Sequence, residues 1–320
     1  MGDKPIWING ANTPWHLWNE FGSSFDANWW TNHFQTMRGK GMNATRVWIS
    51  CDGQVGINID ANGMVSGASD LYWSHLDSFF QIAKANKIYV NVTLMSFDHF
   101  KAGRGNFQSW RNLINSDANI DSYIKNFLTP LLTRYRDNPY LWSFDLLNEP
   151  EWASNSESGG SLAWDNLEHY FARAALTIHA NSAALVTVGM GVIKYNSDQM
   201  NGNKVSDAAL QEKVNDSAAK LDFYSVHWYS WMENWWPNPM YTPPNKFGLD
   251  GTKPAIIGEV SAHGTTGHTL LSDFEAAHTN GWQGIMPWTS NGVDSNGGIN
   301  EVSPAIANFF AKYPLLVFPQ

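Results

Sequence analysis

The amino-acid sequence predicts an α/β fold, a (β/α)8 TIM barrel formed by a single domain over residues 1–320. Eight short apolar segments alternate with longer segments of helical spacing, which is typical of a parallel sheet. The length of 320 residues accommodates a barrel of about 250 residues with insertions. An open doubly wound sheet is the main alternative. It usually carries a glycine-rich loop after its first strand, and residues 7–12 contain no GxGxxG pattern.

The predicted strands show little alternation between apolar and polar residues, as expected for strands that are covered on both faces. They span residues 5–9, 44–49, 88–95, 141–147, 185–188, 223–227, 255–258 and 284–288.

Apolar residues at helical spacing lie between these strands. The clearest stripes span residues 30–37, 76–83, 123–131, 270–277 and 306–310, and Asp26 is the expected N-cap of the first. Pro130 falls inside the third stripe, so we expect a kink or a break there. The fifth and sixth helices are only weakly marked. Three connections, 96–119, 190–221 and 229–253, are long and should lie at the carboxyl end of the barrel, where active sites form.

Composition excludes several classes of protein. The net charge of −9 disfavours a nucleic-acid-binding surface, which needs clustered Lys and Arg. A single cysteine, Cys51, excludes an internal disulfide framework and a thiolate zinc cluster. No apolar stretch reaches 18 residues, so we expect no membrane contact. Aromatic residues make up 14% of the chain and include 17 tryptophans, which favours a surface groove suited to sugars.

The N-terminus lacks the basic and apolar segments of a signal peptide. The chain is therefore either intracellular or a mature form with an added start codon. We expect an extracellular monomer whose signal peptide has been removed.

Two predicted strands end in a glutamate. Glu149 follows the fourth strand in an Asn-Glu-Pro sequence, and Glu259 follows the seventh. Either residue alone could be a solvated loop side chain. Together they could approach across the barrel mouth, and two carboxyl groups about 5 Å apart are what retaining glycoside hydrolysis requires. One must be a carboxylate and the other must hold its proton near neutral pH.

Other polar and aromatic side chains are predicted at the same end. Arg46 lies inside an apolar strand and needs a partner, either the nucleophile or a structural ion pair. His227 and Tyr229 alternate to one side of the sixth strand, although a buried core histidine is the simpler interpretation of the former. Trp288 ends the eighth strand, where it could form the floor of a sugar site or fill the core.

In combination, these residues resemble glycoside hydrolase family 5, a family in a clan of retaining (β/α)8 hydrolases. The resemblance spans nearly the whole chain and rests on Arg46, Asn148, Glu149, His227, Tyr229, Glu259 and Trp288. It implies that Glu149 is the acid/base and Glu259 the nucleophile. It also implies that Asn148 binds the substrate 2-hydroxyl and that Arg46 and Tyr229 hold the nucleophile.

The resemblance further implies that His227 forms hydrogen bonds in the active site and that Trp288 is a stacking platform. One departure concerns the end of the third strand, where many cellulases of the family have a histidine. Here His99 lies several residues past the strand, and mannanases of the family often carry Asn, Trp or Asp in this loop. Asp98 and His99 are therefore candidate sugar contacts.

Aromatic residues after the first and sixth strands predict a trough for an uncharged polymer. Prolines stiffen the connection 229–253, which we interpret as a cleft wall. The predicted trough residues, besides Trp288, are Trp15, His16, Trp18, Trp228, Trp231, Trp235 and Trp236.

The sequence thus predicts a retaining endo-β-1,4-glycanase acting on a neutral polysaccharide or oligosaccharide, with mannan narrowly preferred. The alternatives are an endo-β-1,4-glucanase (cellulase), a dual-specificity enzyme, a transglycosylase on the same fold, and a carbohydrate-binding barrel without turnover. We expect no cofactor because the two glutamates supply both the nucleophile and the proton transfer. No histidine pair has the HExxH spacing of a metal site, so we expect no metal.

Overall fold

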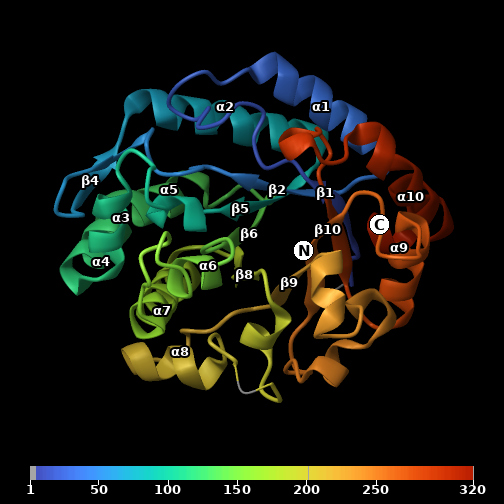
Figure 1. The fold of residues 1–320 in the computed structure, drawn as a ribbon. Helices are drawn as coiled ribbons and strands as arrows, with labels where there is room; N and C mark the ends of the chain where they lie inside the picture. Colours follow the sequence, from blue (N-terminus) through green and yellow to red (C-terminus); the bar gives the residue numbers. More distant parts are fainter. Residues whose placement is uncertain (1–4, 201, 320) are drawn as a thin grey trace.

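The computed structural model describes residues 5–200 and 202–319, so residues 1–4, 201 and 320 of the predicted domain lie outside this description. Parallel strands form one sheet in the order β7-β6-β5-β2-β1-β11-β10-β9-β8. Its two outermost strands, β7 and β8, are separated in the chain only by Val188, so the sheet closes on itself. The predicted (β/α)8 barrel is therefore confirmed (Figure 1).

The strands β7 and β8 together occupy the fifth of eight barrel positions. The barrel strands are β1 Ile8–Asn12, β2 Ala44–Trp48, β5 Tyr89–Thr93, β6 Leu141–Asp145, β7 Leu185–Thr187, β8 Gly189–Met190, β9 Tyr224–Trp228, β10 Ala255–Ser261 and β11 Gly284–Trp288. A separate antiparallel pair, β3 Ile57–Ile59 and β4 Val65–Ala68, extends the connection after β2.

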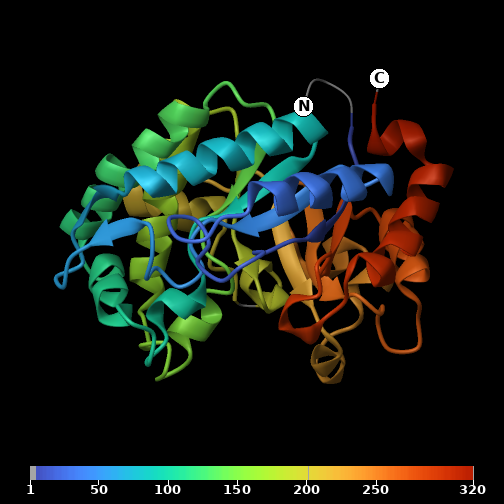
Figure 2. The same ribbon diagram turned by 90° about the horizontal axis from the view of Figure 1, so that it is seen from above.

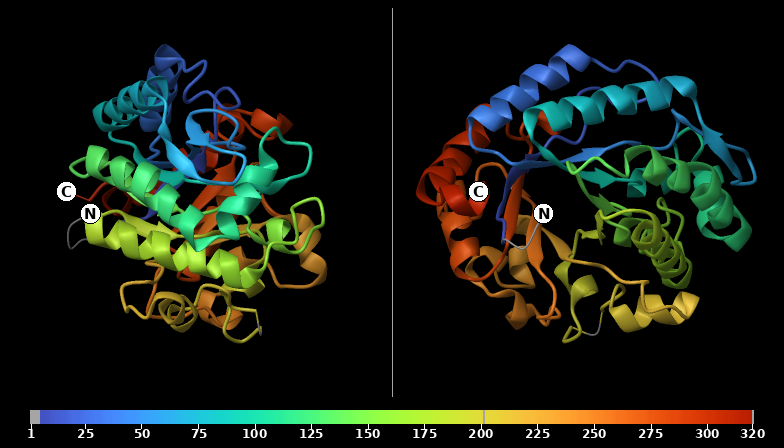
Figure 3. Two further views of the ribbon diagram at one scale, coloured as in Figure 1. Left: turned by 90° about the vertical axis from the view of Figure 1, so that its left-hand side faces the viewer. Right: turned by 180° about the vertical axis from the view of Figure 1, so that it is seen from behind.

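Helices surround the sheet (Figures 1 and 3). They are α1 Ala27–Gly39, α2 Asp70–Asn86, α3 Phe107–Ile114, α4 Asp117–Tyr123, α5 Thr129–Tyr135, α6 Glu151–Ser154, α7 Trp164–Asn181, α8 Asp207–Val214, α9 Leu270–Thr279, α10 Ile299–Lys312 and α11 Pro314–Val317. Asp26 is the N-cap of α1, as predicted, because its carboxylate accepts hydrogen bonds from the backbone N–H groups of Asn28 and Trp29. None of the described helices is both long enough and apolar enough to cross a bilayer.

The structure corrects several predicted boundaries. The first strand begins at Ile8 and ends at Asn12, three residues beyond the prediction, because backbone carbonyls satisfy the amides of Asn9, on the side of α10, and of Asn12, between the barrel strands. The seventh strand continues to Ser261 and so contains Glu259. The helix does not break at Pro130. It passes through a π-helical turn, Ile124–Leu128, and continues as α5.

The connection after β9 contains no α-helix among its residues 229–253. Short 3₁₀ turns replace it: η4 Ser230–Asn234, η5 Pro239–Tyr241 and η6 Pro244–Phe247. Proline at the first positions of η5 and η6 favours such short turns over a continuous helix. This connection therefore contributes no regular outer helix, and η5 packs along α9, where the carbonyls of Met240 and Pro239 accept from the side chains of Asn280 and Trp282.

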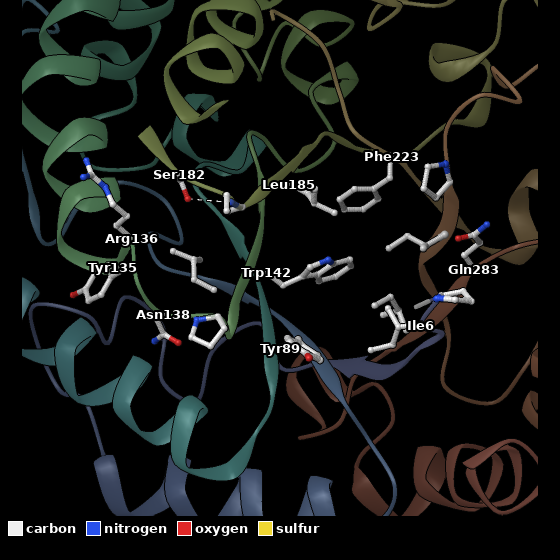
Figure 4. Close-up of a pocket in the computed structure, with 18 residues that line it drawn as sticks. Ile6, Tyr89, Tyr135, Arg136, Asn138, Trp142, Ser182, Leu185, Phe223 and Gln283 are labelled. Carbon is white, nitrogen blue, oxygen red and sulfur yellow. Dashed lines mark hydrogen bonds between the residues drawn. The ribbon is translucent and has the colours of Figure 1, made fainter. Parts of the chain in front are cut away.

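The first and last parts of the chain meet at the amino end of the barrel, where the backbone N–H of Trp7 bonds to the carbonyl of Leu316 at 3.0 Å (Figure 2). The same end holds a cavity of about 550 Å³, lined by the first residues of several strands, including Ile8, Tyr89 and Leu141. Figure 4 shows Trp142 at the centre of this lining, and its ring stacks on Phe223 at 5.2 Å.

Candidate active site

The two predicted glutamates meet at the carboxyl end of the barrel. Glu149 lies just beyond β6, with its backbone N–H bonded to the carbonyl of Gly189. Its φ of 50° is left-handed, a strained value for a residue other than glycine. Glu259 lies within β10 at a register shift against β9, and its register partner is His227. One carboxylate oxygen of each glutamate and one ring nitrogen of His227 all lie within 4.8 Å of one another.

Arg46 organises this end of the barrel. Its side chain is fully buried, and its Nη1 donates to Oε1 of Glu259 at 2.6 Å. Its Nε and Nη2 both donate to Oδ2 of Asp145, and Nη2 also donates to Oδ1 of Asn148 at 2.8 Å. Arg46 therefore links the second, fourth and seventh strand positions. The structure agrees with both predictions for this residue, because it holds the Glu259 side chain and also forms a structural ion pair with Asp145.

Asp145 was missed by the sequence analysis, although it anchors the arginine. It is fully buried, and its other carboxylate oxygen accepts from the backbone N–H of Gly189 at 2.8 Å. A Cβ at Gly189 would lie 2.8 Å from Nη2 of Arg46 and 2.9 Å from Nε2 of His227, so only glycine fits there. The available signal was an aspartate inside an apolar strand, the same signal that identified Arg46.

Both oxygens of Glu259 receive hydrogen bonds. Oε1 is held by Arg46, and Oε2 accepts the hydroxyl of Tyr229 at 2.7 Å. Burial raises the pKa of Glu259, while the arginine charge and the tyrosine hydroxyl act in the opposite direction. Because both donors favour the carboxylate, Glu259 is equipped to remain ionised in a site that water barely reaches.

Glu149 has a different environment. Its Oε2 accepts the indole N–H of Trp152 at 2.8 Å, and its Oε1 lies 2.8 Å from Nδ1 of His227. Burial raises the pKa of Glu149 to about 7, against the opposing effects of the Trp152 N–H and the Arg46 charge. The side chain therefore keeps its proton in mildly acidic solution, as a general acid requires.

His227 is fully buried between the two glutamates. Burial lowers the pKa of His227 to about 4, so the ring is neutral near neutral pH and carries one N–H. It can therefore either donate to Glu149 through Nδ1 or accept its proton there, but it cannot do both. Its Nε2 has no hydrogen-bond partner among the residues that the structure describes.

Asn148 is held beside Glu149 from two directions. Its side-chain oxygen accepts from Arg46, and its backbone N–H bonds to the carbonyl of Met95 at 2.9 Å. Its amide nitrogen points to the hydroxyl of Ser96, at 3.5 Å. The structure thus brings Asn148 to the site together with Glu149, as predicted.

Aromatic rings form a floor beside Glu259. The ring of Trp288 lies 5.3 Å from that of Trp48 and 6.1 Å from that of Trp15, both in edge-on geometry. Tyr229, which donates to Glu259, packs against the same cluster. Trp288 is only 9% exposed, so a sugar could reach an edge of this ring. The platform role implied for Trp288 remains a prediction.

Three residues predicted to bind substrate lie away from any open surface or are engaged in packing. Trp228 is fully buried in the main core, because alternation along β9 directs it away from the side that carries His227 and Tyr229. His99 is also fully buried, and its ring nitrogens face Ser50 and the backbone of Ser96. Its burial lowers the pKa of His99 to about 3. These positions argue against direct sugar contact by either side chain.

His16 is the third such residue: it stacks at 4.0 Å on Trp29 of α1. Trp18 and Asp98, by contrast, remain accessible. The indole of Trp18 donates to Asp52, and the carboxylate of Asp98 accepts from Arg104 at 3.0 Å. The guanidinium of Arg104 lies 5.0 Å from the Trp18 ring centroid, which joins these residues into one polar group beside the site.

A further set of tryptophans is exposed around the connection after β9. Trp231 is 43% and Trp235 63% exposed, and their ring centroids lie 6.0 Å apart. Trp236 follows at 6.3 Å and is partly buried. On the other side, Trp231 lies 6.3 Å from Trp152, the residue that donates to Glu149. The predicted cleft wall is therefore aromatic and continuous with one of the two glutamates.

The cluster of Glu149, His227 and Glu259 has the spacing to hold a metal ion. Its chemistry is unsuited to one, because the guanidinium of Arg46 already lies 2.6 Å from Oε1 of Glu259. A divalent cation at this oxygen would face a permanent positive charge at close range. The arrangement fits one carboxyl group that donates a proton beside one that acts as a nucleophile better than it fits metal binding.

Comparison with known families agrees with this geometry. The family model described as Cellulase (glycosyl hydrolase family 5) matches residues 3–292. The chain belongs to glycosyl hydrolase family 5. Family membership confirms that this barrel is that of a glycoside hydrolase, as the resemblance implied.

Relatives within family 5 match over most of the chain. A mannan endo-1,4-beta-mannosidase from Mytilus edulis is 26% identical, with 91% of this chain and 85% of the relative covered. One from Cryptopygus antarcticus is 23% identical, covering 91% and 82%. The crystal structure of endo-1,4-beta-mannanase from Eisenia fetida superposes with a TM-score of 0.84 at 23% identity, covering 97% of this chain and 92% of that one. At this identity the structural likeness shows the fold.

Proposed function

We propose that this family 5 protein is an endo-β-1,4-mannanase that cleaves mannan or glucomannan with retention of configuration. The proposal depends above all on the approach of Glu149 and Glu259, whose nearest oxygens lie within 4.8 Å. Retaining enzymes hold their carboxyl groups about 5–5.5 Å apart, whereas inverting enzymes need roughly 6.5–9.5 Å to admit a water molecule. The names of the relatives support mannan as the substrate.

In the first step, an ionised oxygen of Glu259 attacks the anomeric carbon while the bond from that carbon to the glycosidic oxygen breaks. Glu149 gives its proton to the departing oxygen, and a glycosyl ester forms on Glu259. The hydrogen bonds from Arg46 and Tyr229 hold the nucleophile in its charged form and fix its orientation.

In the second step, water attacks the anomeric carbon and the ester bond to Glu259 breaks. Glu149, now a carboxylate, takes the proton of that water and returns to its starting state. Glu149 can act first as an acid and then as a base. Its raised pKa keeps the proton in place for the first step, and Glu259 loses its negative charge when the ester forms, which favours the carboxylate of Glu149 in the second. Both protonation states of Glu149 are used, so a pKa near 7 suits both halves of the reaction. The steps written here use no cofactor.

An endo-β-1,4-glucanase is the second candidate, because the matching family model is itself described as a cellulase. Mannose and glucose differ only in the orientation of the C2 hydroxyl, near which we propose that Asn148 lies. The two candidates therefore share every step above and differ in substrate alone.

A reducing-sugar assay on glucomannan, galactomannan, carboxymethyl cellulose, β-glucan and xylan tests the proposal. We expect release from both mannans and little from xylan, and NMR of the first product should show the β-anomer. Equal rates on galactomannan and carboxymethyl cellulose would contradict the preference for mannan. An α-anomer as first product would contradict retention.

We also propose that the protein acts outside the cell as a monomer. A polymeric substrate does not cross a membrane, which supports the location. Light scattering after size exclusion should give the mass of one chain, 35.9 kDa, and a dimer mass would contradict the monomer.

A further inference from the structure

Three exposed tryptophans form a row that begins at the carboxyl group of Glu149. We call Trp152, Trp231 and Trp235 the Trp152 row; they are 39%, 43% and 63% exposed. Neighbouring ring centroids in the row lie 6.3 Å and 6.0 Å apart. Contiguous exposed aromatic rings are unusual on a monomer and indicate a binding surface. Their flat faces suit the C–H faces of sugar rings.

The row contacts only one of the two glutamates directly. The indole N–H of Trp152 donates to Oε2 of Glu149 at 2.8 Å. The aromatic cluster of Trp48 and Trp288, by contrast, contacts Tyr229, whose hydroxyl donates to Glu259. The site therefore has two separate aromatic surfaces, one on the side of each carboxyl group.

The chemistry assigns a direction to these two surfaces. The general acid must face the oxygen that departs, so the sugars beyond that oxygen lie on the side of Glu149. The nucleophile faces the anomeric carbon, so the sugar that becomes covalently attached lies towards Glu259. A surface that begins at Glu149 and leads away from the site is thus placed for the leaving group.

Resting on the function proposed above, we propose that the Trp152 row binds the leaving-group part of the chain and that Trp152 is a positioning residue for Glu149. The same indole presents its ring face to the sugar and its N–H to the carboxyl group. A sugar seated on the row would restrict the Trp152 ring and thereby fix the Oε2 atom that the N–H holds. Binding of the leaving group and orientation of the acid are then coupled through one side chain.

Two variants separate the two parts of this role. Trp152→Phe keeps an aromatic face and removes the N–H, whereas Trp231→Ala removes the middle ring of the row and leaves the N–H in place. Trp73→Phe is the matched control, since Trp73 lies in α2, packs against Phe127 and contacts neither glutamate. Thermal melting of each variant checks that it is folded.

Two substrates report on the acid. Mannohexaose has a poor leaving group and needs protonation, whereas 2,4-dinitrophenyl β-mannobioside has a leaving group that departs without it. For Trp152→Phe we expect kcat on mannohexaose to fall about tenfold with KM within about twofold, since one hydrogen bond to the acid is lost. The alkaline limb of its pH profile should move to higher pH, because the lost N–H favoured the carboxylate. Its kcat/KM on the dinitrophenyl substrate should stay within about twofold.

For Trp231→Ala we expect the KM for mannohexaose to rise about fivefold or more with an unchanged pH profile and unchanged kinetics on the dinitrophenyl substrate. An unmoved pH profile in Trp152→Phe, or equal losses on both substrates, would overturn the positioning role. An unchanged KM in Trp231→Ala would overturn the row as the leaving-group site.

Failure of the proposed function can be told apart from failure of this inference. If the wild-type enzyme cleaves only β-1,4-glucan, the same variants are measured on cellohexaose and 2,4-dinitrophenyl cellobioside, with the same expected pattern. If it cleaves neither polymer, calorimetry with mannohexaose and with cellohexaose decides. Trp231→Ala must then weaken the binding of at least one hexaose about fivefold relative to the wild-type protein. If the variant binds both hexaoses as tightly as the wild-type protein does, the role of the row is overturned.

Discussion

The carboxyl end of the barrel holds two glutamates, an arginine and a histidine within hydrogen-bonding distance of one another, whereas the amino end encloses an apolar cavity of about 550 Å³. The residues that the structure describes around this cavity include no aspartate, glutamate, histidine or cysteine. Its rings, such as Trp142 on Phe223, pack with one another. The charged end, in contrast, pairs both oxygens of Glu259 and both oxygens of Asp145 with donors from other strands or their ends.

The difference between the two ends shows that the presence of a cavity does not by itself locate the candidate active site. Both ends are formed by the same strands, but it is the carboxyl end that brings together carboxyl and imidazole groups whose pKa values are shifted by burial and by nearby charges. Strand ends at the carboxyl side are followed by long connections that can supply further walls. Substitutions at the two ends of the barrel test this contrast.

Replacing Glu259 by glutamine should abolish turnover. The variant Glu259→Gln keeps the shape of the side chain and one acceptor for Tyr229, but it cannot form the glycosyl ester, so kcat on mannan should fall about 10⁴-fold or more. A reducing-sugar assay measures this. Glu212→Gln, at an exposed glutamate on α8, is the control and should be fully active. Undiminished turnover in Glu259→Gln would show that another group is the nucleophile, whereas a wild-type protein that binds mannan without cleaving it would favour a carbohydrate-binding barrel.

The acid should control the alkaline side of the pH profile. Because burial raises the pKa of Glu149 to about 7, the protonated form dominates below that pH and is lost above it. The kcat/KM on mannohexaose should therefore decline as pH rises through about 7. In Glu149→Gln, turnover of polysaccharide should fall about 10²- to 10⁴-fold. On the dinitrophenyl substrate this variant should have no alkaline limb near 7, and a limb that persists there would assign the pKa to another group.

Arg46 should matter for both stability and activity. The variant Arg46→Lys keeps the charge but cannot contact Asp145, Asn148 and Glu259 at once, as the planar guanidinium does. We expect the free energy of unfolding to fall by about 3 kcal/mol, as when a buried ion pair is broken, and kcat to fall about 100-fold. Chemical denaturation and steady-state kinetics measure these. A variant with full activity would show that the orientation of Glu259 does not depend on this network.

The smallest effect on activity is expected at the amino end. Trp142→Phe replaces a buried indole at the cavity by a smaller ring and should lower the free energy of unfolding by about 1–3 kcal/mol. Its kcat/KM on mannan should remain within about twofold of the wild-type value. A loss of activity well beyond the loss of stability would show that the two ends are coupled and would contradict the separation drawn here.

The sequence was sufficient to identify residues whose signal is local. Glu149 and Glu259 each follow an apolar run, so their position at strand ends could be read from neighbouring residues. Tyr229 and His227 were placed on one side by simple alternation, and the structure brings both to the glutamates. The same alternation should have excluded Trp228, which the aromatic composition of the connection instead placed in the cleft.

Other features depended on contacts between distant parts of the chain. Asp145 lies in an apolar strand, but its role as the anchor of Arg46 depends on a residue 99 positions away in the sequence. His99 was a candidate sugar contact because it lies in the loop after the third strand, yet it is buried against Ser50. Neither the left-handed φ of Glu149 nor the hydrogen bond that Trp152 donates to its carboxyl group is indicated by composition.

The sequence by itself determined the alternation of strands and helices, the barrel, and the two glutamates at the ends of its strands, because hydrophobic periodicity and strand termini are local properties. Only the tertiary structure decided that burial raises the pKa of Glu149 to about 7 and that the donors Arg46 and Tyr229 oppose the effect of burial on the pKa of Glu259. That difference arises from burial and from donors on other strands, such as Arg46 and Tyr229 for Glu259 and Trp152 for Glu149. Such pKa shifts depend on distances across the barrel, which the order of residues along the chain does not specify.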